Sequence, residues 1–237
     1  MNMMLLHEND FIAPDRVSIC GRRAVHIREI LKKEQGSSIK VGKINDLMGN
    51  AVVVSWHDDA IELTVNLDCQ PPPALGISLL LAMPRPIVFK RLLPAIVSMG
   101  IKELHLFNCQ KVEKSYWSSS VFDELDSLVW LGLEQSRDTI WPQIKIHKRF
   151  KPFAEDEIPS IIAGKTALVA HPGSEIFCPA ALKNPAAICV GPEGGFTDFE
   201  VDLLLHQGFQ AVSIGTRILR TETAIPAILG RLVGSCS

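Results

Sequence analysis

A glycine-rich loop at 191–196 constrains the fold of this chain more than any other sequence feature. It reads Gly-Pro-Glu-Gly-Gly-Phe and follows an apolar run, Ala-Ala-Ile-Cys-Val, that is typical of a buried strand. Thr197 and Glu200 have the spacing of a capping box, so a helix begins there, and Gly208 ends it. Another strand pattern follows at 210–215. This order predicts a β-α-β unit, and such units build parallel sheets.

The rest of the chain after residue 71 repeats this alternation of strand and helix. We therefore predict an α/β domain with a parallel sheet that carries helices on both faces. Ligands bind at the carboxyl ends of the strands in such sheets, which directs attention to the segments after 171, 191 and 215. The predicted strands are 77–83, 102–107, 143–147, 166–171, 186–191 and 210–215, and the predicted helices are 86–100, 120–136, 197–207 and one from about 223.

The first 70 residues predict a small β-barrel with one helix. The helix is expected at 22–33, where apolar residues recur at helical spacing and Gly36 follows. Three prolines at 71–73 form a stiff segment, so we place the domain boundary there, with domains at 1–70 and 71–237. Strands are predicted at 38–44, 51–56 and 61–67, separated by turns at Asn45-Asp46, Gly49-Asn50 and Asp58-Asp59.

Composition excludes several classes of protein. Hydrophobic residues make up 47% and charged residues 21%, which is typical of a globular chain. No apolar run is long enough to span a membrane, and the first residues lack the pattern of a secretory signal, so we expect a cytoplasmic protein. The six cysteines, of which Cys236 is the last, include no C-x-x-C pair. We therefore expect neither a metal site nor a disulfide framework.

Positive charge is concentrated in one segment. Residues 16–43 contain eight basic and two acidic residues, between flanking stretches that are acidic. This pattern is found on an ordinary solvated helix face, and also on a surface that binds an anionic polymer such as RNA. The candidate phosphate contacts are Arg22, Arg23, Arg28, Lys32 and Lys33.

The glycine loop lacks the features of a nucleotide phosphate site. The chain has neither the dinucleotide fingerprint nor a P-loop, the loop has no lysine, and Glu193 would repel phosphates. A tight turn would explain one glycine but not three glycines and a proline. The loop therefore favours a ligand without a phosphate chain, and S-adenosylmethionine is one such ligand. A second motif at 214–224 places Arg217 and Arg220 near a helix start, where the helix dipole disfavours cations.

The two motifs together resemble a known family. GPEGGFTDFE followed by IGTRILRTETA is similar to the ribosomal RNA small subunit methyltransferase E family, whose members methylate N3 of a uridine in 16S rRNA with S-adenosyl-L-methionine. The resemblance implies a SPOUT-type parallel sheet with a deep trefoil knot, preceded by a small PUA-like β-barrel. It also implies a homodimer that acts on 16S rRNA or the small ribosomal subunit.

The resemblance assigns roles to individual residues. Arg217, Arg220 and Glu222 would face the RNA substrate or brace the knot. Because a guanidinium stays protonated, Arg220 is the candidate for stabilising a uridinate oxygen, and Glu222 is a candidate base or, as we favour, the partner of Arg220. The chain departs from the family pattern at its start, which has no arginine before Arg16. The implied cofactor-binding residues are Ala170, His171, Gly191, Pro192, Glu193, Gly194, Ile214, Gly215, Ile218, Leu219 and Ala224.

Three other functions compete with this assignment. A SPOUT-class enzyme could act on a different RNA site, or the chain could be a non-enzymatic RNA-binding protein. A nicotinamide oxidoreductase is disfavoured because the dinucleotide fingerprint is absent. Among the tryptophans, Trp117 is the candidate for stacking on a base and Trp130 the candidate for the core.

Overall fold

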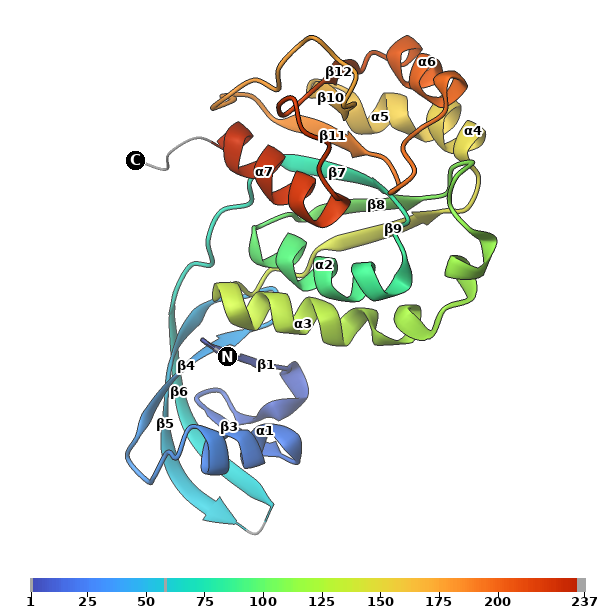
Figure 1. The fold of residues 1–237 in the computed structure, drawn as a ribbon. Helices are drawn as coiled ribbons and strands as arrows, with labels where there is room; N and C mark the ends of the chain where they lie inside the picture. Colours follow the sequence, from blue (N-terminus) through green and yellow to red (C-terminus); the bar gives the residue numbers. More distant parts are fainter. Residues whose placement is uncertain (1, 58, 234–237) are drawn as a thin grey trace. The chain divides into compact units, whose positions relative to one another are not determined.

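The computed structural model describes residues 2–57 and 59–233 (Figure 1). Asp58 and Cys236, which entered the predictions above, lie outside these residues. The chain forms two compact units, one of Met1–Pro73 with Trp130–Trp141 and the other of Ala74–Val129 with Pro142–Ser237. Trp130–Trp141 belongs to the N-terminal unit because its backbone is hydrogen-bonded there: the Asn45 N–H donates to the Thr139 carbonyl at 2.9 Å.

The N-terminal unit is built on a six-stranded sheet with the order β1-β4-β5-β6-β3-β2. β1 pairs with β4 in parallel, and the other neighbours are antiparallel. Alternate residues face the core, so Val17, Ile19, Ile61 and Leu63 are fully buried. The strands predicted in 38–67 are found, whereas the first three were not predicted. The strands are β1 (Met4–Leu6), β2 (Phe11–Ala13), β3 (Arg16–Cys20), β4 (Ser38–Lys43), β5 (Met48–His57) and β6 (Ala60–Cys69), with a short 3-10 helix η1 (Glu8–Asp10).

The turn predicted at Gly49-Asn50 is wrong, because both residues lie inside β5. A bulge between Met48 and Gly49 brings the backbone against the facing strand. A Cβ at Gly49 would lie 1.9 Å from the carbonyl oxygen of Asn66. This glycine therefore permits a close backbone approach within a strand.

The helix predicted at 22–33 is also shorter than expected. It consists of α1 (Arg22–Val25) and a π-helical segment η2 (His26–Ile30). Lys32 then takes a φ of 48°, and the Lys33 N–H donates back to the Ile27 carbonyl at 3.1 Å. A left-handed residue of this kind ends the helix before Gly36 is reached.

The C-terminal unit contains a six-stranded sheet with the order β12-β10-β11-β7-β8-β9, and every neighbouring pair is parallel. All residues of β7 and β11 are buried, since helices cover both faces of the sheet. Figure 1 shows α2 and α7 on one face and α5 and α6 on the other. The strands are β7 (Ile77–Ala82), β8 (Glu103–Phe107), β9 (Gln143–His147), β10 (Thr166–Ala170), β11 (Ala186–Val190) and β12 (Gln210–Val212).

The helices of this unit mostly follow the prediction, with one omission. The helical stretch at 150–162 was not predicted, because Pro152, Pro159 and three consecutive acidic residues mask its apolar spacing. No helix in the part of the chain that the structure describes has the length and apolar character needed to cross a membrane. The helices after residue 74 are α2 (Pro86–Ser98), η3 (Lys114–Ser118), η4 (Ser120–Glu124), α3 (Leu125–Ser136), α4 (Phe150–Pro152), η5 (Phe153–Glu157), α5 (Ile158–Ile162), α6 (Asp198–His206) and α7 (Thr221–Val233). Residues 130–136 of α3 belong to the N-terminal unit.

Candidate functional site

A cavity of about 440 Å³ lies at the carboxyl ends of β10, β11 and β12. Three segments line it, namely 170–172, 190–196 and 212–224. Every residue predicted to bind the cofactor lines this cavity, and so do Arg217 and Arg220. Glu222 does not. Seven further lining residues were not predicted from the sequence: Pro172, Val190, Gly195, Phe196, Val212, Ser213 and Thr221.

The glycine loop is held in place by hydrogen bonds along its length. The Gly195 N–H donates to the Pro192 carbonyl at 2.8 Å, and Gly195 itself has a φ of 71°, which favours glycine. The Arg85 backbone N–H donates to the Glu193 carboxylate at 3.2 Å. The Lys111 ammonium donates to the Gly194 carbonyl at 2.8 Å. The loop is therefore preformed.

Glu200 joins this loop to the helix that follows. Its carboxylate accepts from the Thr197 N–H at 2.9 Å, and the Thr197 hydroxyl accepts from the Glu200 N–H at 3.4 Å, so the predicted capping box is confirmed. The other oxygen of Glu200 accepts from the Gln110 N–H at 2.7 Å. The side chain is 3% exposed and ties the start of α6 to the segment after β8.

The segment that follows β10 holds the 212–224 wall of the cavity in place by backbone hydrogen bonds. The Ser213 N–H donates to the Ile176 carbonyl at 2.8 Å, and the Cys178 N–H donates to the Ser213 carbonyl at 2.7 Å. Further along, the Ala181 N–H donates to the Arg231 carbonyl in α7 at 2.9 Å. The chain before and after the 214–220 segment is thus bonded to the same stretch of backbone.

The arginines of the second motif project from the lip of the cavity. Arg217 and Arg220 are both exposed, and no ion pair holds either of them within residues 2–57 and 59–233. Glu222 is exposed on the first turn of α7, and no ion pair joins it to Arg220. The two guanidinium groups are the cationic side chains that face this cavity.

The predicted RNA-contacting residues do not form a uniform basic surface. Arg23 donates twice to the Asp10 carboxylate at 2.6 Å, and this hydrogen bond raises the pKa of Arg23. Arg28 lies 4.5 Å from the centre of the Trp56 ring. Arg22 and Lys32 are exposed. Arg23 is therefore occupied by a structural ion pair, contrary to the prediction that it is available to phosphate.

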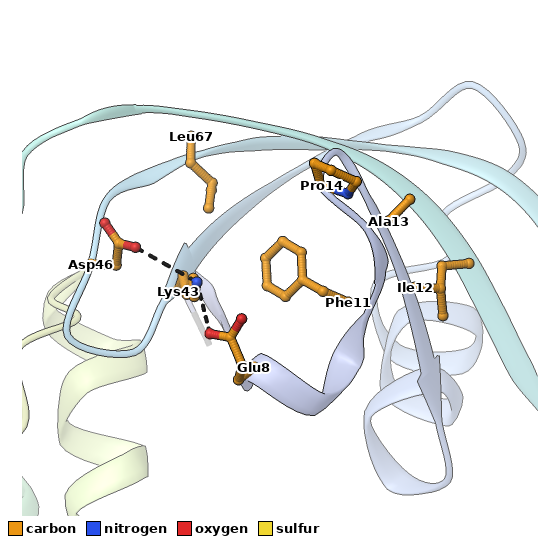
Figure 2. A pocket seen from close by; sticks show the side chains of 8 residues that line it. All are labelled: Glu8, Phe11, Ile12, Ala13, Pro14, Lys43, Asp46 and Leu67. Atoms are coloured by element: carbon orange, nitrogen blue, oxygen red, sulfur yellow. Dashed lines mark ion pairs between the residues drawn. The ribbon is translucent and has the colours of Figure 1, made fainter.

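A second hollow, in the N-terminal unit, accounts for another basic residue of the segment at 16–43. Figure 2 shows the Lys43 ammonium between the carboxylates of Glu8 and Asp46, at 2.8 and 3.7 Å. The ammonium also lies 5.3 Å from the centre of the Phe11 ring. The hydrogen bond to Glu8 raises the pKa of Lys43. With two carboxylates and one ammonium, these three side chains carry a net negative charge, which disfavours phosphate binding in this hollow.

The structure shows the surroundings of the two tryptophans that were singled out in the sequence. The Trp117 indole N–H donates to the Asn108 side chain at 2.9 Å, and its ring stacks on Phe122 with centroids 5.8 Å apart. Trp117 is therefore packed within its own loop. Trp130 is half-buried and lies beside the His7 ring at 4.5 Å, so it is not a fully buried core residue.

A chain of titratable side chains crosses the parallel sheet, beginning at its amino edge. Lys165 lies 3.0 Å from the Glu103 carboxylate and 2.5 Å from the Ser78 hydroxyl, which also bonds to Glu103. The buried His105 bonds to Glu103 and to His147, each at 3.0 Å. Glu103 stands at the amino end of β8 and the cavity at the carboxyl ends of other strands, so we assign this network to stability rather than chemistry.

The pKa values in this network follow from burial and hydrogen bonding. Burial alone would raise the pKa of Glu103, but hydrogen bonds from Ser78, His105 and Lys165 outweigh it and lower the pKa to about 2. Burial lowers the pKa of both His105 and His147. Both rings are therefore neutral at pH 7, with the Nε2–H of His105 donating to Glu103. Within the described residues, no group of three or more His, Cys, Asp or Glu side chains could hold a metal ion.

Comparison with known proteins identifies the family. The model of the RNA methyltransferase domain family matches residues 71–233. The Ribosomal RNA small subunit methyltransferase E 1 of Borreliella burgdorferi is 30% identical over 226 residues, covering 94% of both chains. The chain belongs to the ribosomal RNA small subunit methyltransferase E family. The member from Treponema pallidum is 29% identical over 233 residues, covering 94% of this chain and 87% of its own.

Solved structures share the fold. A crystal structure of the family member from Neisseria gonorrhoeae, bound to S-adenosyl methionine, aligns with a TM-score of 0.72 at 20% identity and covers 96% of this chain and 95% of its own. A probable rRNA methyltransferase from Porphyromonas gingivalis aligns with a TM-score of 0.71, also at 20% identity, covering 96% and 94%. These two proteins thus share the mixed α/β architecture of this chain.

Proposed function

We propose that this protein transfers a methyl group from S-adenosyl-L-methionine to N3 of a uridine in 16S rRNA. The observation that carries the proposal is the single cavity at the carboxyl ends of β10, β11 and β12, which gathers every residue that the family resemblance assigned to the cofactor. Membership of the rRNA methyltransferase family and the S-adenosyl methionine bound to the Neisseria gonorrhoeae protein support it.

The chemistry of the cavity fits this cofactor. Apolar side chains from Val190, Val212, Leu219 and Ala224 offer a surface for an adenine ring. The glycine loop contributes backbone groups and carries no lysine that would select a phosphate chain. When bound, the cofactor supplies an electrophilic methyl group on a positively charged sulfur.

Arg220 and Glu222 have separate roles in the proposed reaction. Uridine N3 carries a proton at neutral pH, so negative charge develops on the base as this proton leaves. Arg220 stays protonated and therefore stabilises that charge rather than accepting the proton. Glu222 is exposed beside the cavity and not paired with Arg220, so its carboxylate is the candidate acceptor for RNA that covers the cavity mouth.

We also propose the deep trefoil knot of the SPOUT class for the domain at 71–237. The segment after β10 is bonded to Ser213 at the end of β12 and to Arg231 and Leu232 in α7. A chain that passes from β12 to α7 between these contacts is consistent with a threaded loop.

The proposal extends to the remaining parts and partners. The domain at 1–70 is proposed as a PUA-like barrel that contacts the phosphates of 16S rRNA or the small ribosomal subunit, in the cytoplasm. A homodimer is proposed because Ile218, on the lip of the cavity, is 84% exposed, and a second copy of the chain would cover it. Light scattering should then give a mass near twice 26.1 kDa.

The decisive experiment is methylation of rRNA by the purified protein, followed by nucleoside mass spectrometry. We expect 3-methyluridine, and its formation should require S-adenosyl-L-methionine. A different methylated nucleoside would keep the enzyme but change the substrate atom. Calorimetry that detects no cofactor binding would instead favour a non-enzymatic RNA-binding protein.

A further inference from the structure

A separate hollow of about 330 Å³ lies at the same edge of the parallel sheet, beyond the carboxyl end of β8. The segment after β8, the start of α4 and the first turn of α6 form its walls. Phe199 and Glu200 on its wall belong to the GPEGGFTDFE motif, but the family resemblance assigned neither of them a role. We call it the β8 hollow, and its chemically distinctive residues are Phe150, Phe199, Lys114 and Lys151.

The two phenylalanine rings form an aromatic surface in the β8 hollow. Phe199 is 60% exposed, although a phenyl ring is usually buried. Phe150 is half-buried and packs against Phe107, with ring centroids 6.0 Å apart. Phe150 is thus held in place, while Phe199 presents most of its ring to solvent.

The charges that a ligand would meet in the β8 hollow are positive. Lys114 is exposed and makes no ion pair among the residues described. Lys151 lies 3.7 Å from Glu155, and an exposed pair at this distance is weak. The acid on the wall, Glu200, is 3% exposed, and both of its oxygens already accept hydrogen bonds. The two lysines therefore dominate the surface.

The β8 hollow is continuous with the proposed cofactor cavity along the chain. Residues 194–196 line the cavity, and Phe199 and Glu200 line the hollow. The Phe196 ring lies parallel to Phe107, with centroids 6.2 Å apart, so the rings connect the two sites. A ligand that occupies both sites would be a polymer rather than a small molecule.

We propose that the β8 hollow binds a nucleotide of single-stranded RNA adjacent to the one that is methylated. Its base stacks on Phe199, and Lys114 and Lys151 contact its phosphates. Proteins bind unpaired RNA by this combination of aromatic rings and cationic side chains. The inference rests on the proposed function, because the neighbouring cavity must hold the methyl donor. It also replaces Trp117 as the stacking residue, since that ring is packed on Phe122.

The test compares two substitutions of one side chain. Phe199→Leu keeps an apolar group but removes the aromatic face, whereas Phe199→Trp keeps an aromatic face. The affinity for a fluorescein-labelled single-stranded oligouridylate is measured by anisotropy, and cofactor affinity is measured by calorimetry. We expect Phe199→Leu to weaken RNA binding roughly 5- to 150-fold, the range for stacking one base, and Phe199→Trp to retain it. Cofactor affinity should stay unchanged in both variants.

A control and a second variant keep the result interpretable. Leu205→Ala removes another exposed apolar side chain of α6 away from the hollow, and should bind RNA like the wild type. Lys114→Ala should flatten the slope of log affinity against log salt by about 0.7, the value for one phosphate contact on a single strand.

Unchanged RNA affinity in Phe199→Leu would overturn the proposal. Weaker binding to the small ribosomal subunit with unchanged binding to RNA would also overturn it, and would indicate a ribosomal protein as the partner. The proposed function is judged separately, by cofactor binding and methylation in the wild type. The RNA affinities of the variants therefore test the proposal for the β8 hollow independently of the cofactor-binding and methylation results.

Discussion

The ion network at the amino edge of the parallel sheet should make the stability of the C-terminal unit depend on Glu103. Its carboxylate accepts hydrogen bonds from Ser78 and His105 and pairs with Lys165 at 3.0 Å. Glu103→Gln removes the negative charge and places an amide N–H₂ where an acceptor is needed. Lys165 then loses its anionic partner in a site where its side chain is only 23% exposed.

The magnitude follows from the pKa of Glu103, which is about 2 instead of 4.5. This difference corresponds to about 3 kcal/mol of unfolding free energy, and solvent screening at a side chain that is 32% exposed reduces it to about 1–2 kcal/mol. Because the pKa is lower in the folded state, the stabilisation is fully present well above pH 4.5 and is lost as the pH falls towards 2. At pH 4, up to about 0.8 kcal/mol should already be lost relative to pH 7.

The assay must report on the C-terminal unit alone, because the chain has two units. Urea unfolding at pH 7 and pH 4, read by pulsed hydrogen exchange and mass spectrometry of peptides from β7 and β8, meets this need. Glu175→Gln, at an exposed acid of the same unit, is the control and should match the wild type at both pH values. If Glu103→Gln were as stable as the wild type, with the same pH dependence, the charge assignment in this network would be wrong.

Three further predictions concern other parts of the chain. Gly49→Ala should lower the melting temperature of the N-terminal unit by several degrees or prevent its folding, because the new Cβ would lie 1.9 Å from the Asn66 carbonyl oxygen. An unchanged melting temperature would contradict the close approach of the two strands at the bulge. Arg23→Ala should lower the unfolding free energy by about 1–3 kcal/mol, because it leaves the buried Asp10 carboxylate without its cationic partner. Arg22→Ala should leave stability unchanged and flatten the slope of log RNA affinity against log salt by about one unit. Equal stability losses of the two variants in urea titrations would refute this difference. Burial lowers the pKa values of His105 and His147, so the unfolded chain binds more protons than the folded one near pH 6. Stability should therefore fall as the pH drops below about 6.5, and imidazole ¹⁵N shifts that show both rings charged in the folded protein at pH 6 would exclude this account.

The candidate cavity could be predicted well because its residues lie in short, contiguous motifs. Thr197 and Glu200 determine where α6 begins, and the preceding apolar run determines where β11 ends. The position of the glycine loop between them follows from local rules alone. Gathering this loop with the segments at 170–172 and 212–224 required only the rule that parallel strands present their carboxyl ends at one edge.

The failed predictions share a different cause. Gly49 has the local sequence pattern of a turn, yet it lies in a strand and allows the backbone of Asn66 on the neighbouring strand to approach closely. Likewise, nothing in the sequence shows that the Trp117 ring packs on Phe122, five positions away. Phe199 lies within the GPEGGFTDFE motif, but its exposure could not be predicted, because nothing in the sequence near it tells whether another element covers the ring.

The sequence by itself determined the order of the strands and of the other helices in the C-terminal unit, since capping boxes, glycine stops and apolar periodicity act over a few residues, but it did not reveal the helical stretch at 150–162. Only the tertiary structure decided which charges are available to a ligand. Arg23 and Arg22 are adjacent and chemically identical, but the fold places Asp10 against the first and leaves the second exposed. Likewise Glu103 acquires its low pKa from Ser78 and Lys165, which are 25 and 62 residues away along the chain. Electrostatic partners are set by distances in space, which local sequence patterns do not encode.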